Sequence, residues 1–352
     1  MFHPTPEELQ RQISELQAQL AITQGKPLAT NESITASQGS SLIKISGNVF
    51  GNVTLHTGTG PSPRQLLVHY LQILITDCQR LNIDNVDKKV ALEASSLMRL
   101  SAVFTMPSIS TFSNVRGAVT HLRGSNSLIE FVSRNSHTVL LGKPGTGKTA
   151  FSSFLCLCIA GHLTQNAEIS LSLLGPLWKS GTPLPLRIKL KEYANTSMLK
   201  GLSLWDHLKK SWSGALEGFS DPVRQHLLSE GGLLVLDGLD DISEEFDLRR
   251  KLRESILAFH KQFPNVRQLI TSRTYVYIDK EWQLPGFQLA EIAPFVKQQQ
   301  ETFIDRWHAE SIRLDNPPRA GRCRKLKEVL SDHTDIEEIS RNPLILTLIS
   351  SW

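Results

Sequence analysis

The residues with the clearest chemistry form a glycine-rich segment, Gly142–Thr149 (GKPGTGKT). This segment fills all eight positions of the spacing G-x-x-x-x-G-K-T, which is typical of loops that bind the phosphates of nucleotides. An apolar run, Val139–Leu141, precedes it as a predicted strand, and a predicted helix follows from Ala150. The N-terminal dipole of that helix would also favour phosphate. The sequence therefore predicts a binding site for a nucleoside triphosphate.

Each residue of this loop has an expected part in the site. Glycines permit positive φ, so that backbone N–H groups turn inward around an anion, and we expect this of Gly142, Gly145 and Gly147. The ammonium of Lys148 would lie near the β- and γ-phosphates, and the hydroxyl of Thr149 would ligate Mg²⁺. The expected nucleotide contacts are Gly142, Lys143, Pro144, Gly145, Thr146, Gly147, Lys148, Thr149 and Ala150.

A second motif, Gly231–Asp241 (GGLLVLDGLDD), places four large aliphatic residues before an acid. Such a run predicts a buried strand, with Asp237 at its carboxyl end, where open α/β sheets bind their ligands. The Asp237 carboxylate could then hold Mg²⁺ together with Thr149. Asp240 and Asp241 follow closely, and either could orient or deprotonate the attacking water.

A third buried strand is predicted over Val266–Arg273, which ends in an arginine. An arginine at a strand end beside a phosphate-binding loop is well placed to contact the γ-phosphate. Arg273 is therefore a third candidate catalytic residue, after Asp240 and Asp241.

Composition sets broader limits. The chain has 352 residues, 40% of them hydrophobic, which is enough for about two domains with a sizeable core. A net charge of +4 is too small to support nucleic acid as a partner. The four cysteines are scattered, no signal peptide is evident, and the longest apolar run is too short to cross a bilayer. We expect a cytoplasmic protein without a membrane partner.

The predicted fold class is α/β, a three-layer domain with a parallel sheet in the order 5-1-4-3-2. The apolar residues Val115, Val119, Leu122, Leu128 and Ile129 lead into it and are spaced as on one or two helices. Five segments are expected: an amphipathic or coiled-coil helix (1–24), a polar linker with a short β segment within Ser41–His56 (25–62), a helical region (63–113), the nucleotide-binding domain (114–290) and a helical subdomain (291–352).

Taken together, these residues resemble the NACHT group of STAND P-loop NTPases, over about Thr138–Ser351. In that family a small residue follows the acid of the second motif, as Gly238 does here, and further acids come next. Members commonly carry Glu where Asp241 stands, and the resemblance leaves both Asp240 and Asp241 as candidates for the water-activating group. The resemblance assigns the sensor arginine to Arg273. It also assigns a proline that packs on adenine to Pro343, within Asn342–Leu344.

The resemblance implies an ATP-dependent, or GTP-dependent, signalling switch that uses Mg²⁺ and hydrolyses its nucleotide slowly. Nucleotide exchange would permit homo-oligomerisation and activate an effector, in bacterial or antiviral defence. Residues 1–104 would be the adaptor or effector-associated part, since they hold no catalytic constellation.

Two other classes of protein fit the same motifs. One is a motor or nucleic-acid-remodelling ATPase, which would show fast, nucleic-acid-stimulated turnover. The other is a scaffold that binds nucleotide without hydrolysing it. Family members normally continue into a winged-helix region and a repeat sensor domain, whereas this sequence stops within the helical subdomain. The resemblance therefore leads us to expect a fragment or truncated product, or a partner that supplies the rest.

Overall fold

A computed structural model of the chain describes residues 61–81, 98–115, 118–242, 246–277, 283–314 and 321–351. The expected helix over 1–24 and the expected β segment within Ser41–His56 lie outside the described residues. No helix within the described ranges combines the length and apolarity needed to span a bilayer.

The centre of the molecule is a seven-stranded sheet in the order β2-β1-β7-β3-β6-β5-β4. Its five parallel strands are β3 (His137–Leu141), β4 (Pro185–Lys189), β5 (Gly232–Asp237), β6 (Val266–Ser272) and β7 (Gln288–Ile292). Numbered along the chain, these five lie in the order 5-1-4-3-2, which confirms the sequence prediction. All six residues of β5 are buried, because helices cover both faces of the parallel sheet.

A β-hairpin extends this sheet beyond β7. Its strands are β1 (Ser108–Val115) and β2 (Ala118–Ser127), and β1 pairs antiparallel with both β2 and β7. The helices predicted over this lead-in are therefore wrong up to Ser127 and right only for α5 (Leu128–Arg134). The four- and three-residue spacing of the apolar positions is typical of a helix. The segment forms strands instead, because β1 pairs with the open edge of β7. The expected domain boundary at 113/114 falls inside β1.

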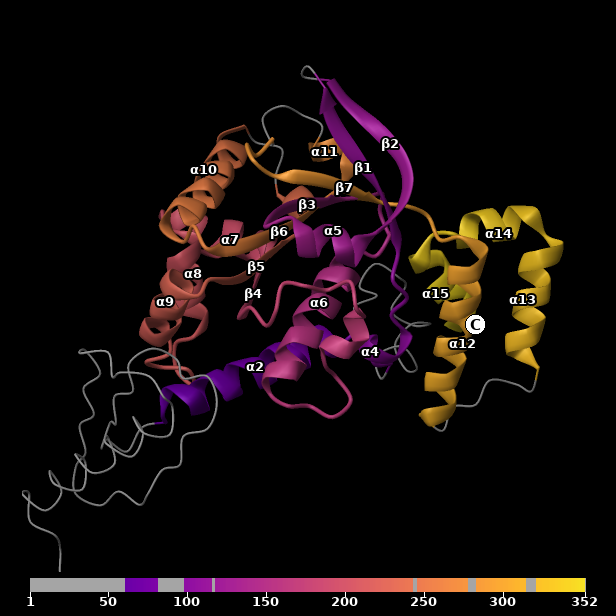
Figure 1. The fold of residues 1–352 in the computed structure, drawn as a ribbon, viewed down its shortest axis with the longest axis horizontal. Helices are drawn as coiled ribbons and strands as arrows, with labels where there is room; N and C mark the ends of the chain where they lie inside the picture. Colours follow the sequence, from indigo (N-terminus) through magenta and orange to yellow (C-terminus); the bar gives the residue numbers. More distant parts are fainter. Residues whose placement is uncertain are drawn as a thin grey trace, which may run out of the picture.

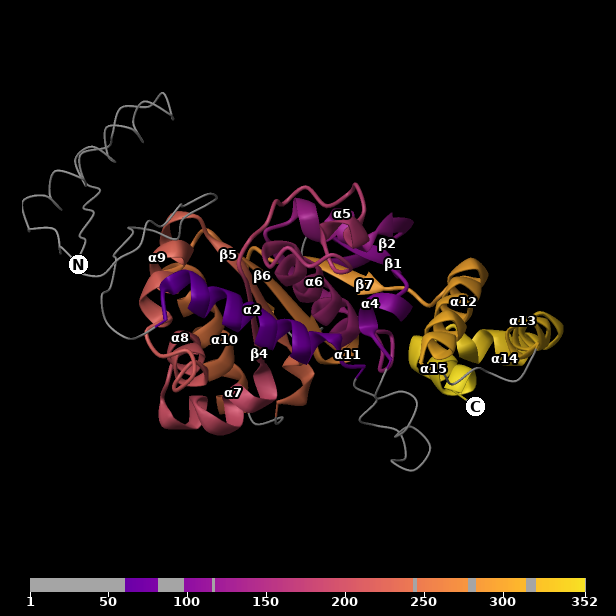
Figure 2. The same cartoon turned by 90° about the horizontal axis from the view of Figure 1, so that it is seen from below.

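Two helices pack against each other beside the sheet, an inner one on its face and an outer one that runs past the β4 edge (Figures 1 and 2). The inner one is α6 (Lys148–Leu163), in which every residue from Phe151 to Gly161 is buried. The outer one, α2 (Pro63–Gln79), starts with a capping box between Ser62 and Gln65, and turns Leu66, Tyr70, Leu71 and Leu74 inward. Both helices agree with the sequence analysis, which predicts a helical region from residue 63 and a helix after the glycine-rich loop.

The remaining helices of the α/β unit include α10 on the opposite face of the sheet (Figure 1). They are α7 (Leu190–Thr196), α8 (Leu204–Ser211), α9 (Ser220–Ser229), α10 (Phe246–Gln262) and α11 (Thr274–Tyr277).

The C-terminal helices form a second, smaller unit, drawn in yellow at the right of Figure 1. They are α12 (Lys297–Arg313), α13 (Arg322–Asp332), α14 (Thr334–Ser340) and α15 (Pro343–Ser351). This unit has its own apolar core, in which Phe303, Ile304, Trp307, Leu330 and Leu346 are buried. A short segment before β1, which contains α4 (Leu100–Val103), packs into the cores of both units.

A buried carboxylate fastens this segment to α12. Glu310 is only 3% exposed and accepts hydrogen bonds from Arg99 and Arg313, the nearest at 2.8–2.9 Å. Arg99 also reaches Glu168, which is 74% exposed, at 2.6 Å. Burial raises the pKa of Glu310, but the bonds from Arg313 and Arg99 outweigh it and bring the pKa down to about 2.

We predict that Glu310→Gln lowers the free energy of unfolding by about 1–3 kcal/mol at pH 7. The matched change Glu168→Gln should cost less than about 0.5 kcal/mol, because that partner of Arg99 is solvated. A folded-state pKa below the ordinary 4.5 stabilises the protein above that pH, and this contribution disappears as the pH falls toward 2. The gap between wild type and Glu310→Gln in urea denaturation should therefore shrink below about pH 4.5. An equal cost for both variants would contradict this role of Glu310.

Candidate nucleotide-binding site

The glycine-rich loop connects the carboxyl end of β3 to the first turn of α6. Gly145 and Gly147 have φ of +78° and +92°, as predicted, and Gly147 is the N-cap of α6. Gly142 does not have positive φ, so that expectation is wrong. A side chain is excluded there for another reason: its Cβ would lie 2.5 Å from Thr146 Oγ1. The loop therefore needs glycine at Gly142 for space and at the other two positions for backbone conformation.

Lys148 curls back over the loop that precedes it. Its Nζ donates to the carbonyl oxygens of Gly142 and Lys143, at 2.8 and 3.1 Å. Burial lowers the pKa of Lys148, while the nearby Asp240 carboxylate acts to raise it. These carbonyls hold the ammonium at the mouth of the loop, where a bound phosphate could replace them as its partner.

Asp237 accepts hydrogen bonds from three different elements of the fold. Its Oδ1 receives the hydroxyls of Thr149 on α6 and Thr271 on β6, at 3.1 and 2.7 Å. Its Oδ2 receives Nη2 of Arg187, on β4, at 2.9 Å. The structure thus brings together the predicted pair Thr149 and Asp237, and adds two partners that the sequence analysis did not assign.

The residues at this point fit a magnesium ion. A threonine hydroxyl and a carboxylate, 3.1 Å apart, are the hard oxygen donors that Mg²⁺ prefers. Within the described ranges, no group of three or more His, Cys, Asp or Glu side chains could hold a metal alone. Mg²⁺ at this place would therefore need phosphate oxygens and water for the rest of its shell.

Asp240 and Arg273 form a closed pair rather than two independent groups. The Asp240 carboxylate accepts the backbone N–H of Arg273 at 3.0 Å and its Nε at 2.7 Å. The side chain of Asp240 is 8% exposed and that of Arg273 is 37% exposed. Each carboxylate oxygen of Asp240 therefore pairs with Arg273, one with its backbone N–H and one with its Nε. This geometry suits Asp240 to orienting the arginine rather than to accepting a proton from water.

Asp241 differs from Asp240 in its surroundings. Its side chain forms no ion pair with any other described residue, and it lies against the backbone of Gly238, where a Cβ would come within 2.5 Å of Oδ2. Gly238 has φ of +83°, and its N–H donates to Thr271 Oγ1 at 2.8 Å. Burial, followed by the like charge of Asp240, raises the pKa of Asp241. This combination suits a group that exchanges a proton.

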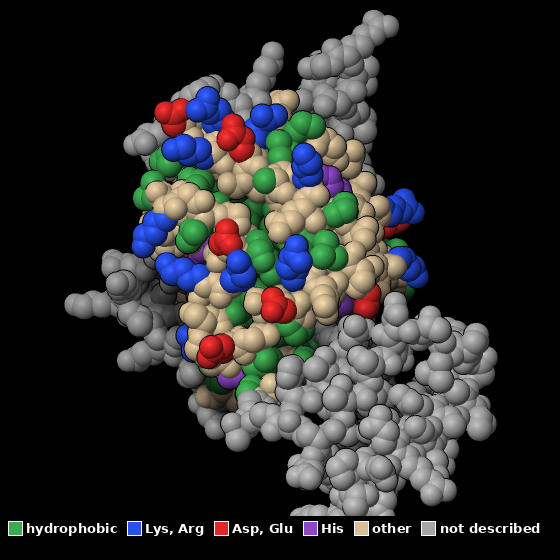
Figure 3. Space-filling view, turned by 90° about the vertical axis from the view of Figure 1, so that its left-hand side faces the viewer, with side chains coloured by type: hydrophobic (Ala, Val, Ile, Leu, Met, Phe, Trp, Pro, Cys, Tyr) green, Lys and Arg blue, Asp and Glu red, His purple; other side chains and the backbone are tan. Residues whose placement is uncertain are grey.

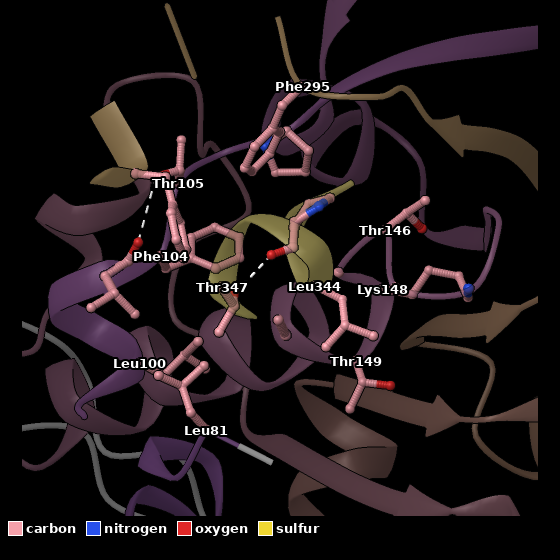
Figure 4. Close-up of a pocket in the computed structure, with 17 residues that line it drawn as sticks. Leu81, Leu100, Phe104, Thr105, Thr146, Lys148, Thr149, Phe295, Leu344 and Thr347 are labelled. Atoms are coloured by element: carbon pink, nitrogen blue, oxygen red, sulfur yellow. Dashed lines mark hydrogen bonds between the residues drawn. The ribbon is translucent and has the colours of Figure 1, made fainter. Parts of the chain in front are cut away.

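A cavity of about 260 Å³ opens beside the loop (Figure 4). Residues Gly145–Ala150 form one wall, and Pro343, Leu344 and Thr347 of α15 form another. The segment before β1 contributes a third wall, with Phe104 and Thr105 labelled in Figure 4. The predicted base contact, Pro343, therefore lies in the same cavity as the phosphate loop.

The first turn of α15 contacts the loop directly. Asn342 Nδ2 donates to Pro144 O at 2.9 Å, and the backbone N–H of Leu344 donates to Gly145 O at 3.2 Å. Asn342 Oδ1 also caps the helix by accepting from Leu344 N at 3.0 Å. Two loop carbonyls are thus satisfied by the C-terminal unit.

The fold and this site define the class of protein. A parallel sheet in the order 5-1-4-3-2, with a glycine-rich loop at the end of its central strand and an aspartate at the end of β5, is that of a P-loop NTPase. Residues 136–311, half of the chain, match the NACHT domain family. The chain belongs to the NACHT family of P-loop NTPases.

Solved structures show only distant similarity. Domain III of the replication initiation protein DnaA from Thermotoga maritima is 11% identical, with 59% of this chain and 75% of that chain covered and a TM-score of 0.32. Cdc6p from Pyrobaculum aerophilum is 17% identical, with 52% and 47% covered and a TM-score of 0.30. The Orc1 protein of Aeropyrum pernix, in complex with DNA, is 14% identical, with 61% and 52% covered and a TM-score of 0.30. Similarity at this level supports no inference about function. A search of curated proteins finds no match.

Sequence reasoning missed three kinds of site residue. Thr271 stands two positions before Arg273, so the strand-end position could have found it. Arg187 is a charged residue between the apolar residues Leu186 and Ile188 of β4, which is a signal of a buried ion pair. Phe104 and Thr105 carry no motif, and only the folded chain brings them to the cavity.

We predict that Gly145→Ala destabilises the nucleotide-free protein more than Gly147→Ala. Both glycines have positive φ, which costs a side chain about 1–2 kcal/mol. Only at Gly145 would the new Cβ also approach Asn342 Oδ1 (2.6 Å) and Leu344 Cβ (2.9 Å), whereas at Gly147 nothing lies within 4 Å. The extra cost should be about 1–3 kcal/mol in guanidinium denaturation. Equal costs would show that α15 does not rest on the loop.

Proposed function

We propose that this protein is a nucleotide-controlled switch that binds ATP with Mg²⁺ and couples the bound nucleotide to the position of its C-terminal helical unit. One observation carries this proposal: α15 is hydrogen-bonded to the phosphate loop, at Pro144 O and Gly145 O, beside the cavity. A ligand that enters the cavity contacts both units at once. Its presence or absence therefore changes the free energy of their contact.

The phosphate end of the ligand would lie along Gly142–Ala150, facing the N-terminus of α6. The Lys148 ammonium would exchange its two carbonyl partners for phosphate oxygens. Thr149 and Asp237 would hold Mg²⁺, which when bound would neutralise charge on the phosphates. These roles follow from donor positions and charges in the loop.

The base would lie in the cavity between Pro343 and the segment before β1. We propose adenine over guanine, because none of the described residues that line the cavity is Asp or Glu. A carboxylate is the side chain that would accept the two ring-edge N–H groups of guanine. The lining is mostly apolar, with the hydroxyls of Thr105 and Thr347 as its uncharged polar groups near the base end.

Hydrolysis, where it occurs, would be slow and would reset the switch. Asp240 holds Arg273 toward the phosphate side, and Asp241 is the candidate base. Signalling through homo-oligomerisation and an effector, in defence and in the cytoplasm, belongs to the same proposal and is supported by the family alone.

A nucleic-acid-remodelling enzyme is less well supported. Such an enzyme usually presents a continuous basic stripe. On the face drawn in Figure 3, the Lys and Arg side chains of the described residues are scattered among Asp and Glu. The test is turnover: stimulation of ATP hydrolysis by DNA or RNA would favour the remodelling enzyme over the switch.

We predict that Lys148→Ala abolishes binding of a fluorescent ATP analogue, lowering affinity by at least about 100-fold, because the loop loses the ammonium that would pair with the phosphates. The exposed Lys200→Ala is the matched control and should bind as wild type does. Unlabelled ATP should displace the analogue at lower concentration than GTP. Retained affinity in Lys148→Ala would refute the loop as the nucleotide site, and preference for GTP would refute the base assignment.

We predict that substitutions of the two neighbouring acids, Asp240 and Asp241, affect single-turnover hydrolysis in different ways. Asp241→Asn should slow single-turnover hydrolysis about 10²–10⁴-fold without changing ATP affinity, since it removes only a proton acceptor. Asp240→Asn should resemble Arg273→Gln, because it releases the arginine. If Asp240→Asn is the slower of the two acid variants and differs from Arg273→Gln, the roles are reversed.

A further inference from the structure

The Asp237 carboxylate already has a cationic partner inside the protein. Arg187 Nη2 lies 2.9 Å from Asp237 Oδ2, and both side chains are buried, at 5% and 6% exposed. The hydroxyls of Thr149 and Thr271 occupy the other oxygen, Oδ1. The guanidinium therefore lies on the same carboxylate that would hold Mg²⁺.

The other end of the same guanidinium contacts the N-terminal part of the chain. Arg187 Nη1 lies 2.9 Å from Oδ2 of Asp77, near the C-terminal end of α2. Asp77 is 47% exposed. One arginine thus bridges a solvated carboxylate on α2 and the buried carboxylate of Asp237.

Contacts with β4 and with α6 fix the position of α2. Tyr70 donates its hydroxyl to Pro185 O, at the start of β4, at 2.9 Å. The next residue after Asp77, Cys78, is fully buried and faces Cys156 on α6. Figure 2 shows α2 beside α6, crossing the β4 side of the sheet. A shift of the C-terminal end of α2 would therefore move Asp77 relative to Arg187.

We propose that Arg187 is a positioning residue that competes with Mg²⁺ for Asp237, and that Asp77 on α2 sets the strength of this competition. The inference rests on the proposed function, because it assumes that Mg²⁺ accompanies the nucleotide at Asp237. When Asp77 holds one side of the guanidinium, part of the cationic charge is balanced there. When α2 withdraws Asp77, more of that charge acts on Asp237, and Mg²⁺ is bound less tightly.

The test is the Mg²⁺ dependence of binding of a fluorescent, non-hydrolysable ATP analogue, titrated from an EDTA-treated sample. Arg187→Met removes the competing charge and should lower the half-saturating Mg²⁺ concentration by about tenfold. Asp77→Asn frees the guanidinium of Arg187 and should raise the half-saturating Mg²⁺ concentration by about two- to threefold. Affinity for the analogue in EDTA should be unchanged in both variants.

The matched control is Glu192→Gln. Glu192 and Asp77 both lie 3.7 Å from Lys189, but only Asp77 touches Arg187. Glu192→Gln should therefore leave the Mg²⁺ midpoint as in wild type, which separates the contact with Arg187 from a general change in surface charge.

The signs of the shifts decide the outcome. If Arg187 had a purely structural role, Arg187→Met and Asp77→Asn would shift the half-saturating Mg²⁺ concentration in the same direction, and that result would overturn the inference. Equal Mg²⁺ midpoints for Asp77→Asn and Glu192→Gln would overturn it as well. If Arg187→Met does not fold, Asp77→Asn against Glu192→Gln still decides it. Absence of nucleotide binding in wild type would instead refute the proposed function.

Discussion

The site depends on the need to satisfy one buried carboxylate, that of Asp237. A charge that is 6% exposed is costly unless it is paired and hydrogen-bonded, and here the partners come from three elements. Thr149 comes from α6, Thr271 from β6 and Arg187 from β4. Because β4 and β6 pair with β5 on either side and α6 begins at the end of the phosphate loop, the fold brings all three donors to the carboxyl end of β5.

The sequence was most informative where a single chemical requirement fixes local structure. The glycine spacing predicts the loop and the start of α6, and short apolar segments predict β3, β5 and β6. The strand order followed from the predicted fold class. Of the candidate residues, Thr149 and Asp237 are brought within 3.1 Å, and Pro343 is brought to the cavity beside the loop. These features are local in sequence or tied to a motif with a physical mechanism.

What could not be predicted depends on contacts between distant parts of the chain. The β1–β2 hairpin forms because β7 offers an open edge, and helical spacing in its apolar residues pointed elsewhere. The role of Gly142 was also hidden, although its neighbour is close in sequence: it lacks positive φ, and a Cβ there would approach Thr146 Oγ1. The pairing of Asp240 with Arg273 joins residues 33 positions apart, so spacing could not show which of two adjacent acids is engaged.

The segment before β1 shows why the two units cannot move independently. Met98 and Val103 are buried in the core of the C-terminal helices, whereas Leu100 and Phe104 are buried in the core of the α/β unit. Phe104 stacks on Phe154 of α6, with ring centroids 4.1 Å apart, and also lines the cavity. A rotation of α12–α15 away from the loop therefore has two possible consequences. Either the segment moves with these helices and Phe104 shifts at the cavity wall, or Met98 and Val103 leave the core of the C-terminal helices. Because both alternatives act on the cavity, the proposed switch would couple the occupant of the cavity to the arrangement of the two units through this segment, in addition to the direct bonds between α15 and the loop.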